Sequence, residues 1–224
     1  EAVCHDYVCA EYKNHYRNGE NFISADCLPV DCDNDHSEDP KDWVTPADVL
    51  EAFPGVSIAI HYSRFNNREK NGKPARPKFH VLFPIDRMTD ATLYSDMKKL
   101  VNSIFPYFDT KALDAARFFF GTQEPNVELY PGRMNLTEFL NDDEFDAGLP
   151  GGHKKDAVIP EGSRNAVMSR FAGIVIKKYG DSEKAYQSFL EKAATCVPPL
   201  DNNELSTIWH SAQRFYLKIS KEDG

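Results

Sequence analysis

The spacing of apolar residues changes character near residue 160, and this change limits the possible folds more than any other feature of the sequence. Before it, segments typical of strands alternate with segments of helical spacing; strands are expected at 27–33, 56–63 and 79–85, and helices at 1–17, 46–53 and 90–104. After it, the pattern predicts only amphipathic helices, at 164–179, 182–195 and 203–219. We therefore expect an α+β protein with a mixed domain over 1–137, an acidic linker over 138–159 and a small all-α domain over 160–224.

Residues with special backbone geometry mark the ends of several predicted elements. Thr45 followed by Pro46 is typical of a helix start, and Pro54 sets the end of that helix. Gly19 and Gly180 are expected to end the helices that precede them. These signals locate elements along the chain without saying how they pack.

Charge is strongly segregated along the chain. The formal net charge is −9, which argues against bulk attraction to nucleic acid. However, residues 26–51 hold nine acids and one base, whereas residues 61–80 hold six bases and one acid. This segregation indicates a local acidic site and a separate basic surface. No apolar run approaches the roughly 20 residues that span a bilayer, so no membrane contact is expected.

The five cysteines are odd in number and show no CxxC spacing. This pattern indicates neither a disulfide framework nor a zinc site, and it fits reduced thiols in a cytoplasmic protein. No zinc is therefore expected.

Two carboxylates lie at the end of the first predicted strand, in the sequence VDCDND at 30–35. Side chains two apart on a strand point to the same face, so Asp31 and Asp33 are expected to lie close together. Such a pair favours a divalent cation, and oxygen ligands favour Mg²⁺ or Mn²⁺ bound together with substrate phosphates. A calcium-binding EF-hand loop is excluded because His36 stands where that loop needs glycine. A solvated acidic turn is the alternative interpretation.

The sequence ARPKFH at 75–80 leads into the third predicted strand. Lys78 and His80 alternate around Phe79, so both should point to one face, where they suit an anionic ligand such as a triphosphate. The preceding loop carries further bases and is expected to be exposed: Arg64, Arg68, Lys70, Lys73 and Arg76. The alternatives are a solvated basic loop and a histidine with a purely structural role.

A third candidate segment is YFDTKALDAARFFFG at 107–121. Asp109 follows two aromatic residues and is expected to return beside the first strand, where a third carboxylate would complete a two-metal site. Arg117 follows eight residues later and precedes an aromatic run, 118–120, which we expect to form a strand and to lie in the core. A base-stacking platform is the alternative role of this run. Asp114 competes with Asp109 for the role of third carboxylate.

Together these segments resemble the motifs of the archaeo-eukaryotic primase superfamily, specifically the primase-polymerases of plasmids, phages and integrated elements. The order is a DxD strand, a basic residue and histidine at the start of a strand, and a hydrophobe and Asp followed by arginine, over about residues 22–135. The resemblance implies an RRM-like catalytic sheet flanked by helices. In it, two divalent ions, Mg²⁺ or Mn²⁺, are held by Asp31, Asp33 and Asp109.

The resemblance also implies a nucleotide site. Lys78 and His80 would bind the triphosphate of the incoming nucleotide, with Arg117 and Arg76 close to it. Where the family motif usually reads Ser-x-His, Lys78 replaces the serine, so the preference between NTPs and dNTPs does not follow. The basic loop is expected to bind template or primer phosphates through three residues: Arg64, Arg68 and Lys73.

The C-terminal region is similar to the small helical domain that follows the catalytic domain in many of these primases. The similarity covers about 160–216 and rests on GSRN at 162–165, VPPLDNNEL and WHSAQRF. In that family the domain is implicated in starting a primer, which implies nucleic-acid contacts by Arg164 and Asn165 at a helix start. Helix capping at the protein surface is the alternative role of these two residues.

We therefore expect a DNA-dependent primase-polymerase that makes and extends primers from NTPs or dNTPs on single-stranded DNA, in replication of a mobile element or phage. The expected partner is a replicative helicase in the same or a separate chain, and the expected location is the cytoplasm of a bacterium or phage-infected cell. Two alternatives stay open: a metal-dependent nuclease or replication initiator, and a catalytically inactive origin-binding module. The His-hydrophobe-His motif of such initiators is absent, since Val81 and Leu82 follow His80.

Overall fold

The computed structural model describes residues 2–70, 72–141 and 158–222. The chain divides into two compact units. The first, called the mixed unit, comprises Glu1–Lys98 and Tyr107–Glu138; the second, called the helical unit, comprises Lys99–Pro106 and Phe139–Gly224. A sheet and separate helices confirm the α+β class expected from the sequence.

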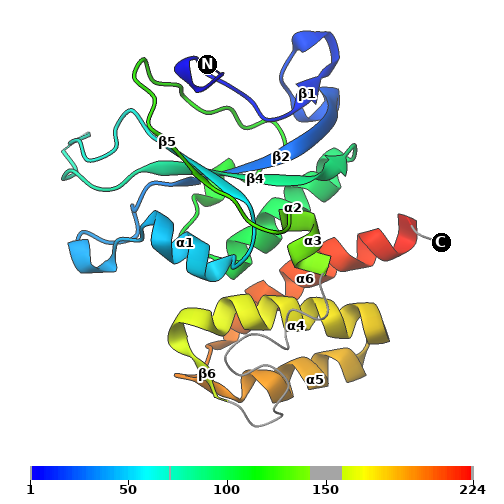
Figure 1. Ribbon diagram of the computed structural model, residues 1–224. Coiled ribbons are helices and arrows are strands. Elements are labelled where there is room, and N and C mark those ends of the chain that lie inside the picture. Colours follow the sequence, from blue (N-terminus) through cyan, green and yellow to red (C-terminus); the bar gives the residue numbers. More distant parts are fainter. Residues whose placement is uncertain (1, 71, 142–157, 223–224) are drawn as a thin grey trace. The chain divides into compact units, whose positions relative to one another are not determined.

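The mixed unit is built on a five-stranded antiparallel sheet (Figure 1). In spatial order its strands are β1 (Glu11–Tyr12), β2 (Phe22–Cys32), β4 (Phe79–Met88), β3 (Ile58–Tyr62) and β5 (Val127–Tyr130). Three helices contribute to it: α1 (Pro46–Ala52), the first part of α2 (Ala91–Ile104) and the first part of α3 (Leu136–Asn141). The predicted strands correspond to β2, β3 and β4, and the predicted helices over 46–53 and 90–104 correspond to α1 and α2.

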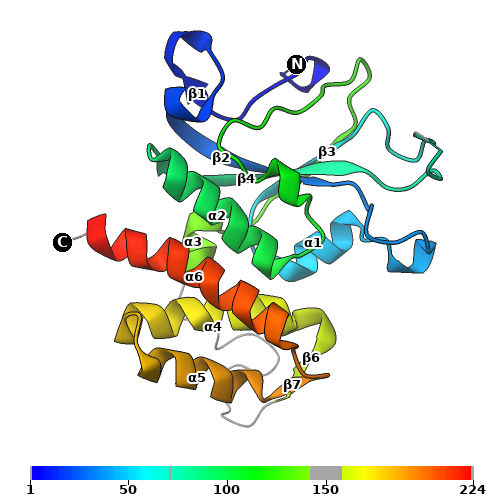
Figure 2. The same ribbon diagram turned by 180° about the vertical axis from the view of Figure 1, so that it is seen from behind.

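Alternation along β4 directs its side chains to two differently covered faces. Phe79, Val81 and Phe83 are fully buried on the face that α1 and the first part of α2 cover (Figures 1 and 2). The ring of Phe53, which follows α1, lies 4.9 Å from that of Phe83 between centroids. His80 points to the opposite face, which the N-terminal segment covers. The sheet therefore has an apolar core on one side and buried polar groups on the other.

Helix α1 begins where the sequence predicts. The carboxylate of Asp48 accepts hydrogen bonds from the backbone N–H and the hydroxyl of Thr45, at 2.6 and 2.7 Å, and Pro46 is the first helical residue. All of these contacts are between residues close together in the sequence, so the start of α1 could be predicted from it.

The helical unit contains the three helices predicted from the sequence, α4 (Arg164–Tyr179), α5 (Glu183–Ala193) and α6 (Asn202–Glu222). Gly180, with a φ of 67°, ends α4 as expected. Helices α4 and α6 approach closely at Gly173, where a Cβ atom would lie 2.4 Å from the ring of Tyr216. Two short parallel strands, β6 (Ile159–Pro160) and β7 (Cys196–Val197), also belong to this unit. None of the helices in the described ranges is both long and apolar enough to cross a membrane.

The N-terminal region is not the helix predicted over 1–17. It forms 3₁₀ turns at Ala2–Cys4 and Lys13–His15 and the strand β1, which pairs with β2. Its aromatic side chains contact distant segments; for example, the hydroxyl of Tyr12 donates to the carbonyl oxygen of Ala115 at 2.7 Å. Such long-range contacts outweigh the local helical spacing, because propensity is only a weak preference.

Two further expectations need correction. Residues 118–120 do not form a strand, since only Phe119 makes an isolated bridge, with Tyr7. The linker expected over 138–159 begins as helix, because Phe139 and Leu140 at the end of α3 are buried. Residues 142–157 of that expected linker lie outside the described residues.

Candidate active site

A row of polar side chains crosses three neighbouring strands on the face that the N-terminal segment covers. Asp31 of β2 lies opposite His80 of β4, and His80 lies opposite His61 of β3. Directly opposite residues have Cβ atoms about 5 Å apart, so the register alone brings these groups together. His80 Nε2 lies 3.8 Å from Asp31 Oδ1, and all three side chains are buried.

Lys78 and Asp33 form a second pair beside this row. The ammonium of Lys78 lies 2.9 Å from Asp33 Oδ1 and 3.5 Å from Asp35 Oδ1, and it donates to the backbone carbonyl of Asp33 at 3.0 Å. Because Lys78 is only 4% exposed, its charge depends on these oxygens. Lys78 and His80 contact Asp33 and Asp31 respectively, so they point to one face, as strand alternation predicts.

The segment that carries Asp109 returns beside the end of β2, as expected. The backbone N–H of Asp109 donates to the carbonyl oxygen of Asp31 at 2.7 Å, and the charge of Asp109 contributes to raising the pKa of Asp31. Arg117 Nη2 lies 4.0 Å from Asp31 Oδ2. The competing Asp114 is exposed, and its carboxylate accepts from the N–H of Ala116 at 2.7 Å. Of the two candidate third carboxylates, Asp109 is therefore the one that the fold brings to Asp31.

The charge of Asp31 is unfavourable in these surroundings. Burial, together with the charges of Asp33 and Asp109, raises the pKa of Asp31 to about 7, although Arg117 and Lys78 act in the opposite direction. Its Oδ1 atom is buried and has no hydrogen-bond partner. Such a carboxylate is stabilised by binding either a proton or a cation.

The carboxylates provide part of a metal site rather than a complete cage. Within residues 2–70, 72–141 and 158–222, no group of three His, Cys, Asp or Glu side chains is close enough to hold a metal ion. Mg²⁺ is commonly held by one or two carboxylates and completes its shell with water and phosphate oxygens. The buried Oδ1 of Asp31 and the neighbouring carboxylate of Asp33 fit this mode, because both are hard oxygen donors. The residues therefore fit a divalent cation that arrives with a phosphate-bearing substrate.

Tyr7 and His61 complete the polar row, and neither was identified from the sequence. The hydroxyl of Tyr7 lies 3.0 Å from His61 Nδ1 and 3.1 Å from His80 Nδ1. Burial, His61 and Arg117 lower the pKa of His80 to about 3, and burial lowers the pKa of His61. Strand alternation is the one local signal for His61. Tyr7 has no local signal, because it lies 73 positions from His80 along the chain.

Lys73 and Arg76 of the basic loop pair with acidic residues that follow β2. Lys73 Nζ lies 2.9 Å from Asp35 Oδ2, and Arg76 Nη2 lies 2.9 Å from Glu38 Oε2. Arg76 was expected to be exposed, but it is fully buried and also donates to the carbonyl oxygen of Asn34 at 2.8 Å, because it is enclosed by the acidic segment. The oppositely charged segments of the sequence thus neutralise each other, and Arg76 holds the acidic segment in place.

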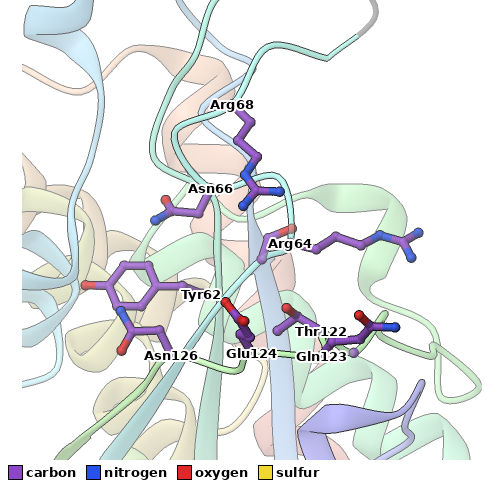
Figure 3. A pocket seen from close by; sticks show the side chains of 10 residues that line it. Tyr62, Arg64, Asn66, Arg68, Thr122, Gln123, Glu124 and Asn126 are labelled. Carbon is purple, nitrogen blue, oxygen red and sulfur yellow. The ribbon is translucent and has the colours of Figure 1, made fainter.

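Arg64 and Arg68, both exposed, line an open pocket of about 540 Å³ at the end of β3. Figure 3 shows its lining, which comes from the segments 62–68 and 121–126 and is mostly polar, with Asn66, Gln123 and Glu124 among its side chains. Two arginines beside amide groups suit a phosphate-bearing ligand.

Phe118 and Phe120 differ from the expectation of a buried aromatic run. Phe120 is 45% exposed, and the guanidinium of Arg64 lies 4.2 Å from the centre of its ring. Arg17 lies over the half-buried Phe118 at 4.8 Å. Only Phe119 of the run is in the core. Arginine over an exposed ring forms a surface on which nucleobases can stack.

In the helical unit, Arg164 is engaged within the protein. Its Nη1 donates to the carbonyl oxygens of Pro198 and Pro199, at 2.8 and 3.0 Å, and its side chain is 12% exposed. Asn165, in the first turn of α4, is half-buried. Arg164 therefore fixes the segment that precedes α6.

Comparisons with protein-family models, with curated proteins and with solved structures give no match for this chain. The geometry of the site is therefore the basis for its function. A buried carboxylate beside a second one, a lysine, a neutral histidine and an arginine can together bind a divalent cation and a chain of phosphates.

Proposed function

We propose that the chain is a DNA-dependent primase-polymerase, which makes and extends primers on single-stranded DNA. The observation that carries the proposal is the convergence of distant segments, since Asp31 lies opposite His80 and its backbone binds that of Asp109. These are the segments in which the sequence resembles the primase motifs. Nucleotidyl transfer requires this combination of acidic and phosphate-binding groups, because the substrate brings a triphosphate and releases pyrophosphate.

An RRM-like catalytic sheet is part of the proposal. Along the chain, the elements β2, α1, β3, β4, α2 and β5 follow the βαββαβ order of ferredoxin-like folds. In space, β4 lies between β2 and β3, as in that fold, but β5 pairs with β3, whereas that fold places its last strand beside the first, here β2. The acidic residues at the end of β2 and the basic residues at the start of β4 therefore lie on adjacent strands.

Each site residue has a role in this chemistry. A bound divalent cation would lower the pKa of the attacking 3′-hydroxyl and stabilise charge on the α-phosphate. Asp31 and Asp33 would hold that cation, with Asp109 as the third carboxylate ligand. Lys78 supplies a positive charge and His80 a neutral N–H for the β- and γ-phosphates. Arg117, with 32% of its side chain exposed, can reach the nucleotide from beside Asp31.

The proposed path of the template runs over the arginine and aromatic surface. Arg64 and Arg68 would bind backbone phosphates, and the exposed ring of Phe120 would stack with a base. In the helical unit, Asn165 near the start of α4 would contact the template or the initiating nucleotide. A replicative helicase, in the same chain or a separate one, is the proposed partner.

Primer synthesis on homopolymer single strands tests the proposal, with NTPs and dNTPs offered separately in Mg²⁺ or Mn²⁺. We expect Asp33→Asn and Asp109→Asn to lower the rate at least about 100-fold, because each removes a cation ligand. Asp26→Asn is the matched control, since Asp26 is exposed on the same strand, β2. Full activity of Asp33→Asn, or no product from the unaltered chain with any nucleotide, would contradict the proposal.

A metal-dependent nuclease is the second candidate function. It is favoured by the position of His61 beside His80, with their Nδ1 atoms 3.3 Å apart, a pairing that the sequence motif does not contain. Incubation of labelled single-stranded DNA with Mn²⁺ and no nucleotide separates the two functions. Cleavage that Asp33→Asn abolishes would identify a nuclease, and nucleotide binding without any product would identify an inactive binding module.

A further inference from the structure

Three side chains from separate parts of the mixed unit meet behind the carboxylates. The hydroxyl of Tyr7 contacts the Nδ1 atoms of His61 and His80 at 3.0 and 3.1 Å, and these two nitrogens are 3.3 Å apart. Tyr7 is held by reciprocal backbone hydrogen bonds with Phe119, at 2.9 and 2.8 Å, and by stacking on its ring. Each member of the cluster is thus held by a different segment: His61 by β3, His80 by β4 and Tyr7 by Phe119.

The number of protons in the cluster restricts how it can bond. The two Nδ1 atoms are only 3.3 Å apart, so both cannot carry a proton, and the hydroxyl of Tyr7 has one proton to donate to either of them. In the first arrangement Tyr7 donates to His80 Nδ1 and accepts from His61 Nδ1–H. In the second, Tyr7 donates to His61 Nδ1 and accepts from His80 Nδ1–H. The arrangements differ in which nitrogen of His80 bears its proton.

The surroundings of the two outer nitrogens favour the first arrangement. His80 Nε2 lies 3.8 Å from Asp31 Oδ1, so a proton on Nε2 faces the carboxylate, whereas the second arrangement directs a lone pair at it. His61 Nε2 is buried with no hydrogen-bond partner. The second arrangement would leave an N–H donor there, and buried donors without partners are rarer than acceptors without partners.

We propose that Tyr7 is a positioning residue whose hydroxyl donates to His80 Nδ1 and thereby keeps the ring proton of His80 on Nε2, directed toward the carboxylates and the substrate phosphates. The role of Nε2–H as a donor to phosphate rests on the proposed function. The hydrogen bond from Tyr7 does not, because it is internal to the protein. The N-terminal segment, which contains no site residue predicted from the sequence, thus determines that Nε2 of His80 on β4 is the donor.

Long-range ¹H–¹⁵N correlation spectra of the imidazole nitrogens at pH 8 test the proposal without any activity. In the unaltered chain we expect His80 to be protonated at Nε2 and to accept at Nδ1. In Tyr7→Phe, the Nδ1 resonance of His80 should shift, because its donor is lost. Tyr12→Phe is the control, since the Tyr12 hydroxyl donates to a backbone carbonyl oxygen, that of Ala115. A proton on His80 Nδ1, or an unchanged Nδ1 resonance in Tyr7→Phe, overturns the proposal.

Primer-extension kinetics provide the second measurement. If Tyr7 orients a phosphate donor, Tyr7→Phe should raise KM for the nucleotide about three- to tenfold with a smaller effect on kcat, because one hydrogen bond to the substrate is weakened. Tyr12→Phe should leave KM unchanged. An unchanged KM for Tyr7→Phe in an active enzyme also overturns the proposed role. Absence of extension by the unaltered chain would instead overturn the proposed function and leave the result from the spectra standing.

Discussion

The two units bury their polar and apolar groups in different ways. In the mixed unit, the sheet brings like charges together, and burial with neighbouring carboxylates raises the pKa of Asp31 to about 7. In the helical unit, buried contacts are mainly between apolar helix faces, such as Phe189 and Trp209, whose ring centroids are 5.2 Å apart. The helical core is thus stabilised by its own apolar contacts, whereas the charge of Asp31 is unfavourable where it lies and the surrounding fold keeps it there.

Asp31→Asn is expected to have the largest effect and to separate activity from stability. Primer synthesis should fall at least about 100-fold because a cation ligand is lost. At pH 8 and without divalent cations, the free energy of unfolding should rise by up to roughly 4 kcal/mol, because a buried charge is removed. Urea unfolding followed by circular dichroism measures the second effect. A variant that is inactive but also less stable would contradict the contrast between the units.

Gly173→Ala tests the close packing of the helical unit. The new Cβ atom would lie 2.4 Å from the ring of Tyr216, so the free energy of unfolding should fall by about 2 kcal/mol even though alanine favours helix. Gly162→Ala is the matched control, because a Cβ atom there meets nothing within 4 Å. Equal losses of stability in the two variants would show that α4 and α6 are not in close contact.

The pH dependence of stability should also distinguish the units. The folded chain holds the proton of Asp31 up to a pKa of about 7, against an ordinary value of 3.8, so this group stabilises the fold below pH 4 and the stabilisation is lost as the pH rises to 7. We expect a loss of roughly 4 kcal/mol over this range in the absence of divalent cations. Asp31→Asn should remove this part of the pH profile, and a profile unchanged in that variant would place its origin elsewhere.

The smallest effect is expected at the exposed aromatic surface. Phe120→Ala should weaken binding of a labelled oligothymidine about fivefold, because one stacking platform under Arg64 is lost. Leu129→Ala is the control, since Leu129 is an exposed apolar residue of β5 without an aromatic ring on which a base could stack. Fluorescence anisotropy measures both affinities, and equal values would exclude this surface from the template path.

The sequence predicted best those elements whose signals are local. Helix α4 was predicted with both of its ends, because Gly180 adopts the positive φ that ends it. Helix α1 was predicted from Thr45 and Pro46, because the groups that cap its start are also adjacent in the sequence. The prediction over 1–17 is wrong because the tyrosines there bind partners that are distant along the chain, for example Tyr12 with Ala115.

The candidate site divides in the same way. Asp31 with Asp33, and Lys78 with His80, could be predicted as pairs because strand alternation directs residues two apart to one face. The burial of Arg76 could not be predicted, because it depends on the acidic segment folding back over the basic loop.

The α+β class, most helix and strand positions and the pairs Asp31 with Asp33 and Lys78 with His80 follow from the sequence alone. They depend on repeats of about 3.6 and 2 residues and on adjacent capping groups. In contrast, it is the folded chain that places Asp31 opposite His80, adds His61 to the row and brings Tyr7 to it from the N-terminal segment. Strand register and the path of the covering segments depend on contacts between residues far apart in the chain. Contacts between such distant residues leave no periodic pattern in the sequence from which they could be predicted.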